Sequence, residues 1–246
     1  MLTNTVYGGK INECAKNKYT VGEKEMAIIA KTKELFDLTK TIAAPLLEKT
    51  EYAWEALPNL KEFIIELGKT LPKDVYDEVS ENVWIAKSAK VFASAYIDGP
   101  TIICEQAEIR HCAFIRGSAV IGRGSIVGNS CEIKNSIIFD GVQTPHYNYV
   151  GDSVLGYHSH MGAGSVTSNV KSDKTNVTVL CGGERVQTGL RKFGAILGDS
   201  VEVGCNSVLC PGTVIGKNST VYPLTRVRGY VPADSIHKGE EIVKKK

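Results

Sequence analysis

The chain has little charge imbalance, no paired cysteine motif and no long apolar run. Its 246 residues carry 29 Lys and Arg against 27 Asp and Glu, a formal net charge of +2, which is too balanced to favour a nucleic-acid-binding protein. Seven cysteines occur without a CxxC pair, so we expect reduced thiols in a cytoplasmic protein without a signal peptide. No apolar stretch approaches the roughly 18 residues of a membrane span, and we expect no membrane segment.

The first third of the chain has a helical pattern. Residues 1–20 are polar, whereas EKEMAIIAKTKELFDLTKTIAAPLLEK (23–49) and NLKEFIIELGKTL (59–71) place apolar residues at spacings of three and four, which predicts amphipathic helices. Trp54 lies between the two segments, and we interpret it as a packing residue. We therefore expect an N-terminal segment and small helical domain over residues 1–82. At the other end, residues 237–246 are expected to form a solvated basic tail.

After Val83 the apolar period becomes six. The repeated positions are Ile85, Val91, Ile97, Ile103, Ile109, Ile115, Ile121, Val127, Ile133 and Phe139, then Leu197, Val203, Leu209, Ile215, Val221 and Val227. Such a period fits neither an α-helix nor simple strand alternation, and it indicates a parallel β-helix with three six-residue rungs per turn. Residues eighteen apart should then lie one above the other. The rhythm fails at Pro145, which predicts a mainly β domain over 83–236 with loops near 144–149 and 170–192.

These hexads resemble the left-handed β-helix of the hexapeptide-repeat acyltransferases. A narrower resemblance, to the C-terminal domains of bifunctional glucosamine-1-phosphate acetyltransferase/uridylyltransferases and archaeal sugar-1-phosphate nucleotidylyltransferases, lies in five stretches. They are EIKNS (132–136), PHYNYVGDSVLG (145–156), MGAGSVTSN (161–169), LRKFGAILGD (190–199) and VLCPGTVIG (208–216). The resemblance implies a left-handed coil and an acetyl-CoA-dependent N-acetyltransferase acting on an amino-sugar 1-phosphate.

A histidine at the predicted break is the candidate catalytic base. The resemblance gives this role to His146, and a loop would let the side chain stand outside the packed coil. The unperturbed pKa of histidine lies near neutrality, which suits proton removal from an amine. Without the surrounding match, a loop histidine bonded to neighbouring backbone would be the better explanation of this residue.

Two cations mark a candidate phosphate site. Arg116 and Lys134 are eighteen residues apart, so they should stack on one face, where two positive charges can bind a phosphate. The resemblance places Lys192 beside them and gives Tyr149 and Asn169 contacts with the sugar. A solvated basic stripe is the alternative for the cations.

The resemblance also implies a donor site. Acetyl-CoA would lie along the coil between neighbouring subunits of a homotrimer, with the Ala163 N–H donating to the thioester carbonyl and Cys205 close to the donor. Acetyl-CoA is a cosubstrate here, and we expect no tightly bound cofactor, no metal, and no partner beyond the two small molecules and identical subunits.

The sequence departs from the bifunctional relatives in ways that keep other functions open. His160 stands where the bacterial enzymes have asparagine, and the first 80 residues contain no glycine-rich loop of the LxGGxGTR type. Glucosamine 1-phosphate is the leading acceptor, with other amino sugars as alternatives. A non-catalytic sugar-nucleotide-binding, regulatory or scaffold subunit is a second hypothesis. A zinc enzyme resembling γ-carbonic anhydrases, using His146, His158 and His160, is a third.

Overall fold

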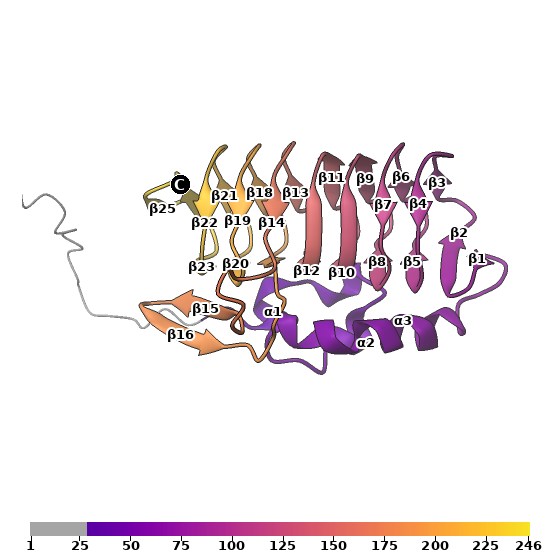
Figure 1. Cartoon of the computed structure of the whole chain (residues 1–246), viewed down its shortest axis with the longest axis horizontal. Helices are drawn as coiled ribbons and strands as arrows, with labels where there is room; N and C mark the ends of the chain where they lie inside the picture. Colours follow the sequence, from indigo (N-terminus) through magenta and orange to yellow (C-terminus); the bar gives the residue numbers. More distant parts are fainter. Residues whose placement is uncertain (1–28) are drawn as a thin grey trace, which may run out of the picture.

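A parallel β-helix forms most of the molecule. The structure, a computed structural model, describes residues 29–246, so the start of the helix expected from residue 23 lies outside the described residues. The coil axis runs along the length of the molecule (Figure 1), and strands of successive turns pair in parallel. The parallel β-helix predicted from the six-residue period is therefore confirmed.

The coil strands lie on three faces. Face A consists of β2 (Val83–Ala86), β5 (Thr101–Ile103), β8 (Ala119–Ile121), the second halves of β10 (Glu132–Ile138) and β12 (Tyr149–Leu155), β17 (Ala195–Leu197), β20 (Thr213–Ile215) and β23 (Tyr230–Val231). Face B consists of β3 (Lys90–Val91), β6 (Glu108–Ile109), β9 (Ile126–Asn129), β11 (Gln143–His146), β13 (His160–Met161), β18 (Glu202–Val203), β21 (Thr220–Val221) and β24 (Ser235–His237). Face C consists of β4 (Tyr96–Ile97), β7 (Phe114–Ile115), the first halves of β10 and β12, β14 (Val166–Thr167), β19 (Val208–Leu209) and β22 (Arg226–Val227).

Three antiparallel elements complete the strands. β1 (Tyr76–Ser80) pairs with β2 at one end of the coil, and β25 (Ile242–Lys244) pairs with β24 at the other. Part of the segment expected as a tail therefore forms a closing hairpin. The hairpin of β15 (Thr178–Cys181) and β16 (Glu184–Gln187) lies between β14 and β17, within the interruption predicted for residues 170–192.

The predicted break at residues 144–149 is wrong. Thr144 pairs with Val127 in the middle of face B, and β11 lies between β9 and β13. The six-residue repeat instead moves back by one residue before this point. Ile121 pairs with Ile138, where an unbroken repeat would pair it with Phe139. The corner between faces C and A loses one residue there, and it does so again in the next turn, where Ile138 pairs with Leu155. Residues eighteen apart therefore stack only before this shift and again later in the coil.

A helical layer covers face A. It contains α1 (Thr32–Leu35), η1 (Leu38–Lys40), α2 (Ala44–Leu47), η2 (Ala53–Asn59) and α3 (Leu60–Gly68), which run along the coil (Figure 1). The second predicted helix corresponds to α3. The prediction of one amphipathic helix up to residue 49 is wrong for its described part, because only short helical pieces form there. The Asp37 N–H instead donates to the Asp199 carboxylate of the coil at 2.7 Å, so contacts with the coil override local helix preference.

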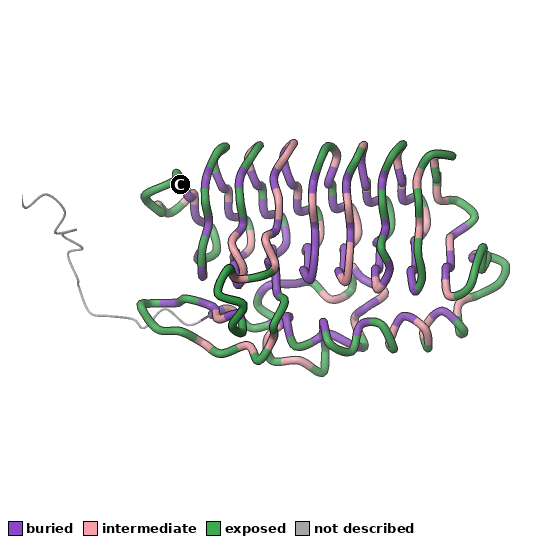
Figure 2. Tube along the Cα trace, in the orientation of Figure 1, coloured by how far each residue is buried: buried purple, intermediate pink, exposed green. Residues whose placement is uncertain are grey.

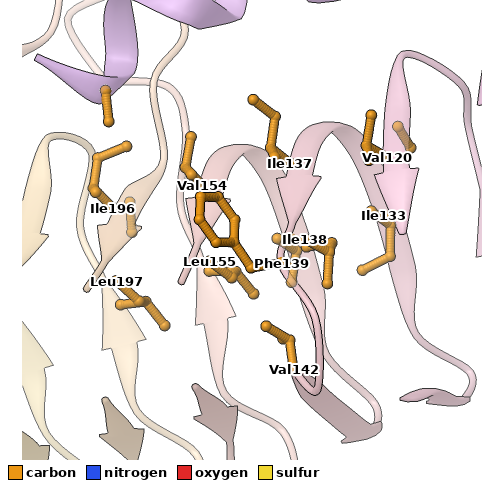
Figure 3. Packing of buried hydrophobic residues seen from close by; sticks show 14 of the residues in the cluster. Val120, Ile133, Ile137, Ile138, Phe139, Val142, Val154, Leu155, Ile196 and Leu197 are labelled. Atoms are coloured by element: carbon orange, nitrogen blue, oxygen red, sulfur yellow. The ribbon is translucent and has the colours of Figure 1, made fainter. Parts of the chain in front are cut away.

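The core extends from the coil interior into this layer. Buried residues run through every turn of the coil (Figure 2). Val120, Ile137 and Val154 point towards the helical layer, whereas Ile138 and Leu155 lie on the opposite side of the strands (Figure 3). All five are at most 1% exposed, and each fully buried aliphatic side chain contributes about 1.5–3 kcal/mol.

Aromatic side chains anchor the layer to the coil. Trp54 is 3% exposed, stacks on Tyr52 with ring centroids 4.6 Å apart, and packs against Phe193 of the coil at 5.6 Å. The Phe139 ring lies 4.8 Å from that of Phe36. Trp54 is therefore the packing residue that the sequence predicted. No helix in the described part of the chain is long and apolar enough to cross a membrane.

Candidate functional site

His146 lies at the corner between faces B and C, at the end of β11. Its side chain is exposed, and its backbone pairs with Asn129 of the preceding turn and accepts a hydrogen bond from Gly164 N–H at 3.0 Å. The corner has the ordinary length, since Thr144 and Val150 are six residues apart like Val127 and Ile133. The histidine therefore stands outside the coil because it occupies an outward position of a regular rung.

A buried asparagine holds this corner in shape. Asn148 is 2% exposed and occupies the crowded inner position that small residues take in other turns. Its Nδ2 donates to the carbonyl oxygens of Gly162 and Ser165 at 2.9 and 3.0 Å, and its Oδ1 accepts from the His146 N–H at 3.2 Å. Both the nitrogen and the oxygen of the Asn148 amide thus have hydrogen-bond partners, and these bonds fix the backbone of this corner.

The two predicted cations stack on face C. Ile115 pairs with Ile133, and the Arg116 N–H donates to the carbonyl of Ile133, so Arg116 and Lys134 follow one another on adjacent turns. Each cation also has a carboxylate partner. Arg116 Nη1 lies 2.6 Å from Glu132 Oε1, and Lys134 Nζ lies 3.0 Å from Asp152 Oδ2. The hydrogen bond to Glu132 raises the pKa of the Arg116 guanidinium, which keeps the group charged.

Asp152 organises the cluster, and sequence reasoning gave it no role. Its side chain is only 5% exposed and accepts hydrogen bonds from Lys134, from Asn135 Nδ2 at 2.8 Å and from Asn169 Nδ2 at 2.5 Å. Asn135 and Asp152 both have positive φ angles and occupy the two shortened corners between faces C and A. The shortened turns therefore bring these polar groups together.

The two predicted sugar-contacting residues touch one another. Asn169 Nδ2 donates to the Tyr149 hydroxyl at 3.1 Å. Burial, followed by the nearby Asp152 carboxylate, raises the pKa of Tyr149, so its hydroxyl keeps a proton that it can donate to a ligand. A Cβ on Gly151 would lie 2.5 Å from the Tyr149 hydroxyl oxygen, so this position requires glycine for Tyr149 to bend towards Asn169.

Lys192 lies beside the cluster because the two residues that follow it bond to the backbone of cluster members. The chain returns to the coil after the β15–β16 hairpin, and there Phe193 N–H donates to the Asn169 carbonyl while Gly194 N–H donates to the Asp152 carbonyl. The Lys192 side chain is exposed. Of the five predicted substrate-binding residues, Lys134 and Asn169 thus bond directly to Asp152 and Tyr149 joins the group through Asn169. Arg116 and Lys192 lie at the edge of that group.

The predicted donor-site residues lie one and two turns of the coil beyond His146. Ala163 follows His146 on the next turn, and the carbonyl of Ala163 accepts from the Asn206 N–H at 2.9 Å. Within residues 29–246, the Ala163 N–H has no hydrogen-bond partner, so it is available to a ligand. Cys205 is exposed on the following turn.

A basic hollow of about 400 Å³ lies further along face C. Lys171, Asp173, Arg226 and Arg228 are among its lining residues. Lys171 pairs with Asp173 at 3.3 Å, whereas no ion pair joins Arg226 or Arg228 to a carboxylate in the described part of the chain. The hollow therefore suits an anionic group.

The histidines on face B have separate partners. His160 Nδ1 lies 2.9 Å from Glu202 Oε2, and the His158 ring packs edge-on against Tyr157. Among residues 29–246, no three His, Cys, Asp or Glu side chains are grouped so as to hold a metal ion.

Comparisons with known proteins support the resemblance seen in the hexads. Residues 97–204 match the model of the GMPPB C-terminal domain. The chain is 34% identical over 200 residues to the bifunctional protein GlmU of Methanococcus aeolicus, covering 72% of this chain and 48% of that protein. It is 34% identical over 146 residues to a bifunctional sugar-1-phosphate nucleotidylyltransferase/acetyltransferase of Sulfurisphaera tokodaii, covering 59% and 36%.

Among solved structures, a hexapeptide transferase family protein from Anaplasma phagocytophilum matches with a TM-score of 0.44 and 14% identity, covering 67% of this chain and 80% of that one. The repeat pattern, the coil and the sequence matches confirm the resemblance to the hexapeptide-repeat acyltransferases. The chain is similar to part of each of these two bifunctional proteins. It spans about half or less of the length of these curated relatives.

Proposed function

We propose that this protein transfers the acetyl group of acetyl-CoA to the amine of an amino-sugar phosphate. The observation that carries the proposal is the polar cluster on face C, in which Lys134 and Asn169 bond to Asp152, Asn169 bonds to Tyr149, and Arg116 lies on the turn before Lys134. The exposed His146 precedes Tyr149 by three residues. The relation to GlmU-type proteins supports an acyltransfer reaction. Glucosamine 1-phosphate is the acceptor we propose first.

The cations retain donors for a phosphate despite their carboxylate partners. A guanidinium has five N–H groups and an ammonium has three. One bond from Arg116 goes to Glu132 and one from Lys134 goes to Asp152. The remaining N–H groups can bind phosphate oxygens on the exposed side of face C, with Lys192 adding a third positive charge.

In the proposed reaction His146 is the general base. The sugar amine attacks the thioester carbon, a C–N bond forms, and His146 takes the proton that the nitrogen loses. The Ala163 N–H stabilises the negative charge on the carbonyl oxygen. The C–S bond then breaks, and the thiolate of CoA takes the proton that His146 received, which restores the neutral base. No covalent acyl-enzyme forms on this route.

The proposal includes a homotrimer with the donor between subunits. The helical layer covers face A, so contacts between identical coils would involve faces B and C, which carry the site residues. Cyclic assemblies are the usual form in which identical chains associate. We also propose that Arg226 and Arg228 bind phosphate groups of the donor in the basic hollow. Light scattering at micromolar concentration tests the trimer, and a monomer would contradict it.

The direct test is thiol release from acetyl-CoA with a panel of amino sugars, with and without a 1-phosphate. Arg116→Ala and Lys134→Ala should each raise KM for the phosphorylated acceptor about 10- to 100-fold, because each removes a charge-assisted bond. The same variants should change KM far less for the unphosphorylated sugar. Equal effects on both acceptors would contradict the phosphate site.

A non-catalytic binding subunit is the second candidate. It uses the same two cations, because their remaining N–H groups can bind a phosphate whether or not a reaction follows. Calorimetric binding of the sugar phosphate without thiol release from acetyl-CoA would support this candidate over the enzyme.

A further inference from the structure

A single buried side chain joins the turn that carries His146 to the turn that carries Ala163. Asn148 stands at an inner corner position between faces B and C where other turns have smaller side chains. These are Ala95, Ala113, Cys131, Ser165, Ser207 and Thr225. A buried polar group needs hydrogen-bond partners, so the partners of Asn148 indicate what its amide does there.

The oxygen of the Asn148 amide holds the backbone of His146. Asn148 Oδ1 accepts from the His146 N–H at 3.2 Å, and the His146 carbonyl accepts from the Gly164 N–H of the next turn at 3.0 Å. Both backbone polar groups of His146 are therefore bonded to groups of these two turns. The point at which the His146 side chain leaves the coil is fixed by these bonds.

The nitrogen of the same amide sets the orientation of the Ala163 N–H. Asn148 Nδ2 donates to the Gly162 carbonyl at 2.9 Å. That carbonyl and the Ala163 N–H belong to one peptide group, which is planar and trans, so they point in opposite directions. Because the carbonyl is held towards the buried Asn148, the Ala163 N–H points away from it. Within residues 29–246 this N–H has no hydrogen-bond partner.

The two groups that Asn148 holds lie on consecutive turns. Hydrogen-bonded strands are about 4.8 Å apart, so the backbones of the two corners are separated by one such step. In the proposed reaction His146 removes a proton from the attacking amine while the Ala163 N–H bonds to the oxygen of the same reacting carbonyl. The rate then depends on the relative placement of the two groups, and a displacement of about 1 Å can cost about 100-fold.

We propose that Asn148 is a positioning residue that orients His146 and the Ala163 N–H relative to one another. The inference rests on the proposed function for the roles of these two groups. Asn148 itself is 2% exposed and acts through them, not through contact with either substrate.

The kinetic test uses Asn148→Ser, which copies Ser165 at the same position of the next turn. The coil therefore has room for the new side chain, which is too short to bond both His146 and Gly162. We expect kcat to fall about 10- to 100-fold, with little change in KM for acetyl-CoA or the amino-sugar phosphate. A kcat at the wild-type level would overturn the proposal.

Ser125→Ala is the matched control. Ser125 is a buried corner residue between faces A and B, and its Oγ also donates to one group of the next turn, the Phe139 carbonyl, and accepts from another, the Val142 N–H. It should keep the wild-type kcat. A loss equal to that of Asn148→Ser would show that any weakened corner lowers activity, and would overturn the specific role of Asn148.

A double-variant cycle separates positioning from loss of folded protein. If Asn148→Ser merely reduced the folded fraction, it would lower kcat by the same factor in wild type and in His146→Ala. If it positions His146, the factor in the His146→Ala background should be smaller, because one of the two groups that it orients is already gone. Equal factors in the two backgrounds would overturn the proposal.

Amide hydrogen exchange tests the same bonds without a substrate. In Asn148→Ser, peptides covering residues 144–150 and 160–168 should exchange about fivefold faster, the effect of losing one hydrogen bond of ordinary net strength. Ser125→Ala should leave both peptides at the wild-type rate. If wild type releases no thiol from acetyl-CoA, the proposed function fails on its own. Unchanged exchange in Asn148→Ser would instead overturn the positioning role.

Discussion

Removal of the Asp152 carboxylate should cost more stability than removal of the Glu132 carboxylate. The ion pair of Asp152 with Lys134 is largely buried, whereas the pair of Glu132 with Arg116 on the same face is partly exposed. Asp152→Ala deletes the acceptor of Lys134, Asn135 and Asn169. The Asp152 side chain is 5% exposed and the Lys134 side chain 21% exposed, so Lys134 would lose its counter-ion while still largely buried. Breaking a buried pair from one side costs about 3–5 kcal/mol. We expect the lower part of this range, since water reaches part of Lys134.

Three companion variants sharpen this experiment. Glu132→Ala removes the partner of Arg116 in a pair whose side chains are 44% and 32% exposed, and its effect on unfolding should be small. Lys134→Met combined with Asp152→Ala should recover part of the lost stability, because the uncompensated charge is gone. Asp152→Asn should cost less than Asp152→Ala, since asparagine tolerates the positive φ of 51° at this position.

The assay is denaturant unfolding followed by circular dichroism, with the free energy of unfolding extrapolated to water. The variants that change Asp152 should also raise KM for the acceptor, because Asp152 positions Asn169. Equal losses of stability in Asp152→Ala and Glu132→Ala, with no recovery in the double variant, would refute the role given to Asp152.

Two further predictions concern the site and the end of the coil. Gly151→Ala should displace the Tyr149 hydroxyl, which its Cβ would approach to 2.5 Å, and should raise KM for the acceptor about tenfold with little change in thermal stability; a wild-type KM would contradict this. Burial lowers the pKa of His237 below its ordinary 6.5. Its contribution to stability is therefore full above pH 6.5 and is lost as the pH falls through the lowered value, where the unfolded chain binds the proton more readily. The melting temperature should fall more steeply between pH 7 and pH 5 in wild type than in His237→Gln, and parallel curves would count against this explanation.

The coil interior was predictable from the sequence because each six-residue rung places one apolar residue inside the coil. The prediction failed at Ile138, where Ile137, Ile138 and Phe139 are all apolar and pattern alone does not show which one points inward. The structure decides in favour of Ile138, since the corner at Asn135 is one residue shorter. The same misplaced register made Pro145 look like a break.

The sequence does indicate that face A is covered, but only when the outward residues of successive turns are compared. Trp84, Ile102 and Val120 are outward residues of face A, eighteen apart, and all are buried by the layer. A coil face exposed to water would carry polar residues at these outward positions. The short helices themselves were not predictable, because their ends are set by contacts with the coil, such as Asp37 with Asp199.

The candidate site was predictable only in part. The stacking of Arg116 and Lys134 followed from their spacing, since they precede the shortened corners. The carboxylates beside them were missed, because Asp152 meets Lys134 only after the turn has lost one residue. Asn148 was missed because a polar residue at an inner corner position is explained only by partners on the next turn.

The general base is the central claim of the proposed function, and steady-state kinetics of one variant test it most directly. His146→Ala should lower kcat about 100- to 10,000-fold, the usual range for loss of a general base, while KM for the amino sugar changes little. Asn129→Ala, which alters the residue paired with His146 on the preceding rung, should keep the wild-type kcat. Turnover at the wild-type rate in His146→Ala would contradict the proposed function at its centre.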